Sequence, residues 1–98
     1  MRLMVLSPEQ INAKLHAVQG WKLDGARIAK TYRFADFATA LQLVNAVAVI
    51  AEHYNHHPDI TLKYGEAAFA LTTHDMGGVT KKDLDMAIEI EKAAVAFV

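Results

Sequence analysis

The feature that most constrains this fold is a long apolar stretch from Ala40 to Ala51, which only two polar residues interrupt. Asp36 precedes the stretch and can cap a helix that runs to about His53 or Asn55. A helix that is apolar on nearly every side is buried on nearly every side. The run is too short to span a bilayer, which needs about 20 apolar residues. We therefore expect one side of the helix to pack on this subunit's own sheet and the other to contact a partner chain.

A hairpin is predicted on each side of this helix. The first covers residues 21–34 around the turn signal Asp24-Gly25, and the second covers residues 59–73 around Gly65-Glu66. Apolar and polar residues alternate in both, as they do in a strand with one buried face. Lys30 breaks the apolar row of the first hairpin. The predicted inward positions are Ile28, Tyr32, Phe34, Phe69 and Leu71.

Shorter helices are predicted near the two ends of the chain. Ser7-Pro8-Glu9-Gln10 forms a capping box with proline at the first helical position, and Thr80 caps the last helix with Asp83 at its third position. The apolar stripe of the last helix is Leu84, Ala87, Ile88, Ala94, Val95 and Val98. Two successive hairpins between helices favour an α+β fold in a single domain, residues 1–98. We expect a four-stranded antiparallel sheet with three helices packed on one face, in the order α-β-β-α-β-β-α.

The composition excludes several classes of function. A net charge of −1 without a basic run argues against binding of nucleic acid. The absence of cysteine excludes disulfides and thiolate nucleophiles. The opening residues are too short for a signal peptide, so a cytoplasmic location is expected. A hydrophobic fraction of 53% is generous for 98 residues and agrees with surface covered by another subunit.

Four of the five histidines fall in two short clusters, Glu52-His53-Tyr54-Asn55-His56-His57-Pro58 and Thr73-His74-Asp75. Imidazole titrates near neutrality, so histidines beside carboxylates suit either proton transfer or a metal site. Within the first cluster, Glu52 and His56 are four residues apart and would share a helical face while the helix lasts, as would His53 and His57. The residues alone leave open a purely structural role at the end of a helix.

His74 follows a predicted strand, where a loop can turn its ring toward the end of the long helix. Strand parity places it opposite Phe69 and Leu71, away from the core. A surface histidine in a polar loop is the alternative. Asp83 likewise has a sufficient structural role at a helix start, and His16 and His53 are interpreted as solvated or helix-face residues.

The combined spacing resembles the pterin-4a-carbinolamine dehydratase family over nearly the whole chain. The residues that carry the resemblance are Gly20-Trp21, Tyr32, Phe34, Asp36-Phe37, Glu52, His56-His57-Pro58, Tyr64, Thr73-His74, Gly78, Thr80, Asp83 and Ala87. Ile60 departs from it, because many members carry an aromatic residue there, and Val79 replaces the usual leucine. The first departure would alter pterin stacking or affinity and leaves the proton-transfer residues in place.

The resemblance implies dehydration of 4a-hydroxytetrahydrobiopterin (pterin-4a-carbinolamine) to the quinonoid dihydropterin plus water, with no metal or organic cofactor. Imidazole can serve as acid or base at neutral pH. By the same resemblance His56 and His74 would be the acid–base pair, in either order, and His57 would position the substrate. Glu52 would orient His56 or tune its basicity, and Asp83 would bind or polarise near His74.

The substrate-binding residues that the family implies are Glu52, Asn55, Thr72, Thr73, Asp75 and Asp83. The family also implies a homodimer or homotetramer in which edge strands pair and the long helices bundle. The apolar helix described above agrees with that assembly.

Two rival hypotheses belong to other classes of function. One is a non-enzymatic protein-binding module, since some animal members of the family are dimerisation cofactors for homeodomain transcription factors. The other is a metal site built from His53, His57 and His74. We rank the dehydratase first, the binding module second and the metal site last.

Overall fold

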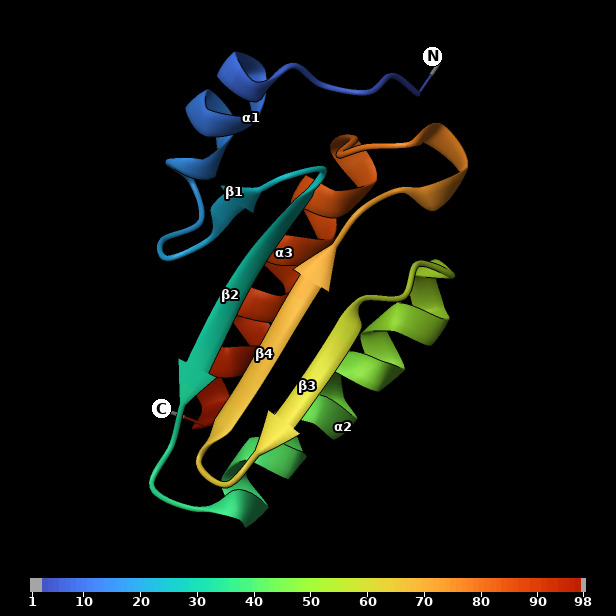
Figure 1. The fold of residues 1–98 in the computed structure, drawn as a ribbon. Helices are drawn as coiled ribbons and strands as arrows, with labels where there is room; N and C mark the ends of the chain where they lie inside the picture. Colours follow the sequence, from blue (N-terminus) through green and yellow to red (C-terminus); the bar gives the residue numbers. More distant parts are fainter. Residues whose placement is uncertain (1–2, 98) are drawn as a thin grey trace.

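A computed structural model describes residues 3–97 and confirms the predicted α+β class. Its four strands form one antiparallel sheet in the order β1-β2-β4-β3. α2 and α3 lie side by side behind that sheet, and α1 lies next to β1 at one end (Figure 1). The elements are α1 (Pro8–Leu15), β1 (Lys22–Asp24), β2 (Arg27–Arg33), α2 (Phe37–Tyr54), β3 (Asp59–Lys63), β4 (Glu66–Leu71), the 3₁₀ turn η1 (His74–Met76), α3 (Lys81–Ala94) and η2 (Val95–Phe97).

Side-chain caps start the helices at the predicted residues. The hydroxyl of Ser7 accepts from the backbone N–H of Gln10 at 3.1 Å, and the side chain of Gln10 accepts from the backbone N–H of Ser7 at 2.8 Å. Asp36 begins α2 by accepting from the backbone N–H of Thr39 at 2.8 Å, and hydrogen bonding to Thr39 lowers the pKa of its carboxyl. Such caps stabilise the first turn because they satisfy backbone donors that have no partner inside the helix.

The core lies between the sheet and the two long helices. Ile28 pairs with Leu71 and Tyr32 with Ala67 across β2 and β4, so the predicted inward positions share one face. Phe34 is half-buried at the edge of this core. The most deeply buried apolar side chains of the sheet and helices are Ile28, Ala40, Leu43, Val47, Ala67, Phe69, Leu71, Ala87 and Ile90.

The predicted apolar stripe of α3 is partly wrong. The buried apolar residues of that helix are Leu84, Met86, Ala87, Ile90 and Ala94. Ile88 is 36% exposed. Met86 and Ile90, two residues before and after it, are on the buried side of the helix, so Ile88 points away from that side. Val95 is 70% exposed and falls in η2, where the tighter 3₁₀ winding takes it away from the stripe. Val98 lies outside the described residues.

Lys30 interrupts the inward row of β2 because it has an ionic partner on α3. Its Nζ atom lies 2.5 Å from Oε1 of Glu91 and 2.7 Å from the carbonyl oxygen of Gln19. The same Oε1 atom accepts from the Trp21 indole N–H at 3.2 Å and from the Tyr32 hydroxyl. This cluster ties the first hairpin and the turn after α1 to α3.

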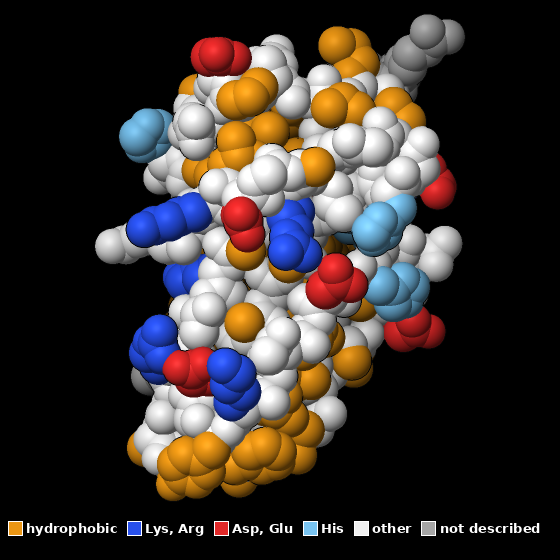
Figure 2. Space-filling model, viewed as in Figure 1, with side chains coloured by type: hydrophobic (Ala, Val, Ile, Leu, Met, Phe, Trp, Pro, Cys, Tyr) orange, Lys and Arg blue, Asp and Glu red, His pale blue; other side chains and the backbone are white. Residues whose placement is uncertain are grey.

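α2 buries one side in this chain and exposes the other. Ala40, Leu43 and Val47 are fully buried, which confirms the predicted packing on the sheet, and α2 also contacts α3. Leu41 is 37% exposed and Val49 is 71% exposed. Figure 2 shows hydrophobic side chains gathered along the edge over α2. Contact of this side with a partner chain stays a prediction. Within residues 3–97, no helix combines the length and apolarity needed to cross a membrane.

Candidate active site

A left-handed turn at Asn55 ends α2 and sets the direction of the histidines that follow. Asn55 has φ 50° and ψ 45°, a conformation that asparagine tolerates better than most residues. The backbone N–H of His56 donates to the Ala51 carbonyl at 3.1 Å, and that of Asn55 donates to the Glu52 carbonyl at 3.4 Å. This pair of bonds is a Schellman-type helix end. His56 and His57 therefore lie outside the helix, and the predicted pairing by helical spacing does not apply to them.

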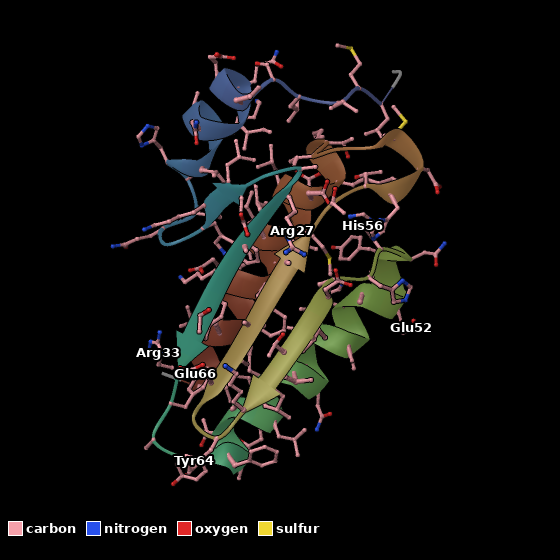
Figure 3. The ribbon with its side chains drawn as sticks, in the orientation of Figure 1. Arg27, Arg33, Glu52, His56, Tyr64 and Glu66 are labelled. Carbon is pink, nitrogen blue, oxygen red and sulfur yellow. The ribbon has the colours of Figure 1, made fainter. Side chains whose placement is uncertain are left out.

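His56 turns inward and meets Asp83, which lies in the first turn of α3. The Nε2 atom of His56 is 2.6 Å from Oδ1 of Asp83. The side chain of His56 is 12% exposed and that of Asp83 is completely buried. Figure 3 shows His56 at the end of α2, next to the loop that leads from β4 into α3. The end of one helix and the start of another thus form an imidazole–carboxylate pair.

The buried carboxylate of Asp83 has further donors. Its Oδ2 atom accepts from the Thr73 hydroxyl at 2.8 Å and from the backbone N–H of Thr80 at 2.9 Å. Burying a charge costs several kcal/mol unless hydrogen bonds replace its water, and here they do. The N-terminus of α3 adds favourable electrostatics, because helix dipoles favour negative charge there.

His57 faces the surface and pairs with Glu52. Its Nε2 atom contacts a carboxylate oxygen of Glu52, and both side chains are largely exposed. The prediction that Glu52 orients His56 is therefore wrong in this structure, because the turn at Asn55 directs His56 toward α3 and leaves His57 beside the last turn of α2. Figure 2 shows histidine side chains next to acidic groups over this end of the helix.

The loop after β4 contains the remaining predicted residues. His74 and Asp75 are exposed in η1, and Gly77 closes the loop with φ 77°. The backbone N–H of Thr73 donates to the Gly78 carbonyl at 3.0 Å. No hydrogen bond joins the side chain of His74 to another described side chain. Asp83 bonds to His56 and to Thr73, the residue before His74, and a role of Asp83 near His74 stays a prediction.

The two threonines of this loop use their hydroxyls inside the protein. The Thr72 hydroxyl donates to the Ala26 carbonyl at 2.6 Å. Thr73 is 5% exposed and its hydroxyl is bonded to Asp83 and Thr80. The hydroxyl hydrogens of both threonines are therefore already used within the protein. The side chain of Asn55 is exposed, and its clear role is the turn that ends α2.

A cavity of about 420 Å³ opens beside His56, between the end of α2 and one side of α3. Its lining residues are Tyr54, His56, Lys82, Asp85, Met86, Ile88 and Glu89. This volume is within the range of small-molecule sites. Of these seven residues only His56 was predicted as a site residue, although Tyr54 lies inside the histidine cluster. His57 and His74 are not part of this lining.

The hypothesis of a metal site gains no support. Among residues 3–97, no three histidine, aspartate or glutamate side chains come together in an arrangement that could hold a metal ion. His53, one of the three proposed ligands, packs edge-on against Tyr54 with ring centroids 4.8 Å apart.

A carboxylate-bound imidazole at the rim of a cavity is an arrangement suited to general acid–base chemistry. Together with the sheet covered by helices, it defines an α+β protein with a candidate acid–base site. Comparison with known proteins gives the family. Residues 4–93 match the family model described as pterin 4 alpha carbinolamine dehydratase.

Relatives of known sequence agree with that match. A protein from Thermosynechococcus vestitus is 42% identical over 90 residues, which cover 92% of this chain and 95% of the relative. One from Sulfurisphaera tokodaii is 40% identical over 87 residues, covering 89% and 94%. Both are named provisionally as pterin-4-alpha-carbinolamine dehydratases. The chain belongs to the pterin 4 alpha carbinolamine dehydratase family, as its sequence pattern predicts.

Solved structures share the fold. The crystal structure of a transcriptional coactivator/pterin dehydratase from Brucella melitensis matches with a TM-score of 0.86 at 34% identity, covering 92% of this chain and 98% of that one. A pterin dehydratase-like protein described as a RuBisCO assembly factor in the alpha-carboxysome matches with a TM-score of 0.62 at 17% identity, covering 76% and 86%. The second likeness supports the fold alone.

Proposed function

We propose that this protein dehydrates 4a-hydroxytetrahydropterins to the quinonoid dihydropterin. The observation that carries the proposal is the His56–Asp83 pair beside a cavity, in a chain that matches the family model over residues 4–93. The C4a–oxygen bond breaks as a ring nitrogen loses its proton, and the electron pair of that N–H bond forms the new double bond. Hydroxide is a poor leaving group, so an acid must protonate it while a base takes the nitrogen-bound proton.

In this proposal His56 and His74 form the acid–base pair, and His57 positions the substrate. Asp83 orients His56 and stabilises the charge that the ring gains when it accepts a proton. No step needs a metal or an organic cofactor, because proton transfer alone completes the dehydration. General acid–base assistance of this kind accelerates a reaction about 10²–10⁴-fold.

The direct test is stopped-flow absorbance of chemically generated 4a-hydroxytetrahydropterin, with and without purified protein. We expect dehydration above the spontaneous rate, reduced about 10²–10⁴-fold in His56→Ala and in His74→Ala. His16→Ala is the matched control, because His16 is an exposed histidine at the end of α1 and should leave the rate unchanged. Folded protein that gives no acceleration would refute the proposal.

A protein-binding role is the second candidate, favoured by the exposed apolar side chains of α2. The Brucella relative is named both coactivator and dehydratase. The double variant His56→Ala/His74→Ala should lose dehydration and keep the exposed apolar surface of α2, because both substitutions leave Leu41 and Val49 in place. If wild-type protein shows no dehydration but complements a cell that lacks it, and the double variant complements equally well, the binding role is the better explanation.

A further inference from the structure

We propose that Thr73 and Thr80 form, with Asp83, a buried hydrogen-bond chain that holds His56 in a single tautomer, so that Nδ1 is its reacting nitrogen. Thr73 is then a positioning residue rather than a substrate ligand. The part that concerns catalysis rests on the proposed function, whereas the tautomer is a property of the free protein.

The tautomer follows from the donors and acceptors around Asp83. An ionised carboxylate only accepts hydrogen bonds. Because Oδ1 of Asp83 lies 2.6 Å from Nε2 of His56, the hydrogen between them belongs to Nε2. A neutral imidazole has one N–H, which leaves Nδ1 of His56 with its lone pair.

The carboxylate of Asp83 is also held by donors that do not depend on His56. Oδ2 accepts from the Thr73 hydroxyl at 2.8 Å and from the backbone N–H of Thr80 at 2.9 Å. Both are short bonds to a charged acceptor, the stronger class of hydrogen bond. They also fix the plane of the carboxylate, so that Oδ1 is directed at the imidazole.

The hydroxyls of Thr80 and Thr73 donate in sequence toward Asp83, so the hydrogen-bond chain runs in one direction. Thr73 has a single hydroxyl hydrogen, which it donates to Asp83. The bond of 2.7 Å between the Thr73 and Thr80 hydroxyls must then be donated by Thr80. The oxygen of Thr80 in turn accepts from the backbone N–H of Lys82 at 3.3 Å. Thr80 and Asp83 are fully buried and Thr73 nearly so, and no water is needed to complete the chain.

The free nitrogen of His56 faces outward. Among the described residues, every buried side-chain nitrogen or oxygen has a hydrogen-bond partner. Nδ1 of His56 makes no hydrogen bond to a described residue, so it reaches solvent, and His56 lines the 420 Å³ cavity. In the proposed reaction Nδ1 accepts the proton that leaves the pterin ring nitrogen. The resulting imidazolium donates to Asp83 through Nε2, and the proton on Nδ1 is later lost to solvent.

The test is the tautomer of His56 from ¹⁵N–¹H correlation spectra of ring-labelled protein without ligand, with His56→Ala to assign the signals. We expect wild type to show a protonated Nε2 and a bare Nδ1. In Asp83→Asn the amide oxygen should take the Oδ2 position, because two donors point there. The amide NH₂ would then face His56 and force the hydrogen onto Nδ1, inverting the tautomer. A wild-type ring protonated on Nδ1, or the same tautomer in both proteins, would overturn the proposal.

Thr73 is tested by a matched pair of substitutions. Thr73→Val keeps the shape and removes the hydroxyl, whereas Thr73→Ser keeps the hydroxyl. We expect Thr73→Val to lower kcat about tenfold, roughly the loss of one charge-assisted hydrogen bond, with KM little changed. Its His56 ¹⁵N shifts should move toward values averaged between tautomers, and Thr73→Ser should restore both readouts. Equal behaviour of the two variants would refute the role of the hydroxyl.

The proposed tautomer and the proposed dehydratase activity can be refuted independently of each other. Spectra as expected from a protein that does not dehydrate pterins would disprove the proposed function and leave the hydrogen-bond chain established. Dehydration by a protein whose His56 carries its hydrogen on Nδ1 would support the proposed function and disprove the proposed tautomer.

Discussion

At the scale of the residue, Asp83 shows how one side chain can satisfy a structural and a functional interpretation together. Its Oδ2 atom completes the capping box that starts α3, while Oδ1 bonds to His56. The two oxygens of a carboxylate allow this division, because each accepts independently. The capping role follows from the sequence, since Thr80 is only three residues away. The contact with His56 joins residues 27 apart, and local spacing does not predict it.

Asn55 provides a prediction at the same scale. Its left-handed backbone turns His56 out of α2, and a side chain with a Cβ atom but no local polar group is disfavoured there. We expect Asn55→Ala to lower the free energy of unfolding by about 1–2 kcal/mol. Asn55→Gly should cost less than about 0.5 kcal/mol, because glycine adopts positive φ freely. Urea unfolding of the three proteins decides this, and equal losses in both variants would contradict it.

At the scale of the element, the cluster around Glu91 connects the first hairpin to α3. Burial raises the pKa of Glu91, but hydrogen bonds from Lys30 and Tyr32 outweigh it, and the pKa of this carboxyl lies below its ordinary 4.5. Burial, and then the bond to Glu91, raise the pKa of Tyr32 far above its ordinary value. Sequence reasoning identified Lys30 as a break in the apolar row, but its partner lies 61 residues further on.

Acid should weaken this cluster. A carboxyl whose pKa is lower in the folded state contributes stability above its unfolded pKa, and this contribution is lost as the pH falls through the folded value. We expect Glu91→Gln to cost about 1–2 kcal/mol at neutral pH, after allowance for its partial exposure. The difference from wild type should shrink below about pH 4.5. Urea unfolding at a series of pH values measures it, and a constant difference would show that the charge of Glu91 does not matter.

At the scale of the whole molecule, the unpaired side of α2 remains the strongest reason to expect an oligomer. Phe37, Leu41 and Val49 are exposed apolar residues on one helix, and β3 is an edge strand. Exposed apolar surface of this kind is typical of an interface between subunits. The predicted homodimer or homotetramer would cover it.

Val49→Asp tests this expectation. Val49 is 71% exposed in the single chain, so the substitution should not harm the fold of one subunit. A carboxylate buried in an interface costs several kcal/mol, so we expect the assembled species to dissociate. Val95→Asp is the matched control, because Val95 is 70% exposed but lies on η2. Size-exclusion chromatography with light scattering gives the masses. A wild-type monomer, or an unchanged assembly in Val49→Asp, would contradict the prediction.

The main helices and strands, the fold class and the family can all be predicted from the amino-acid sequence, whereas the 3₁₀ turns η1 and η2 were not predicted. Caps act over three residues, turn signals over two and strand alternation over two, so these interactions are present in the sequence before any packing. The order of two hairpins among three helices then predicted a four-stranded antiparallel sheet, whereas the strand order β1-β2-β4-β3 was found only in the structure.

The pairing of each histidine with its carboxylate depends on how the elements pack and could not be predicted from the sequence. Helical spacing predicted that Glu52 lies beside His56. Because the backbone of Asn55 is left-handed, Glu52 contacts His57 instead. The packing of α2 against α3 then brought His56 to Asp83. Such contacts depend on the backbone angles of a single residue and on the relative placement of two helices. Both are set by the sum of many packing interactions, which no short stretch of sequence specifies.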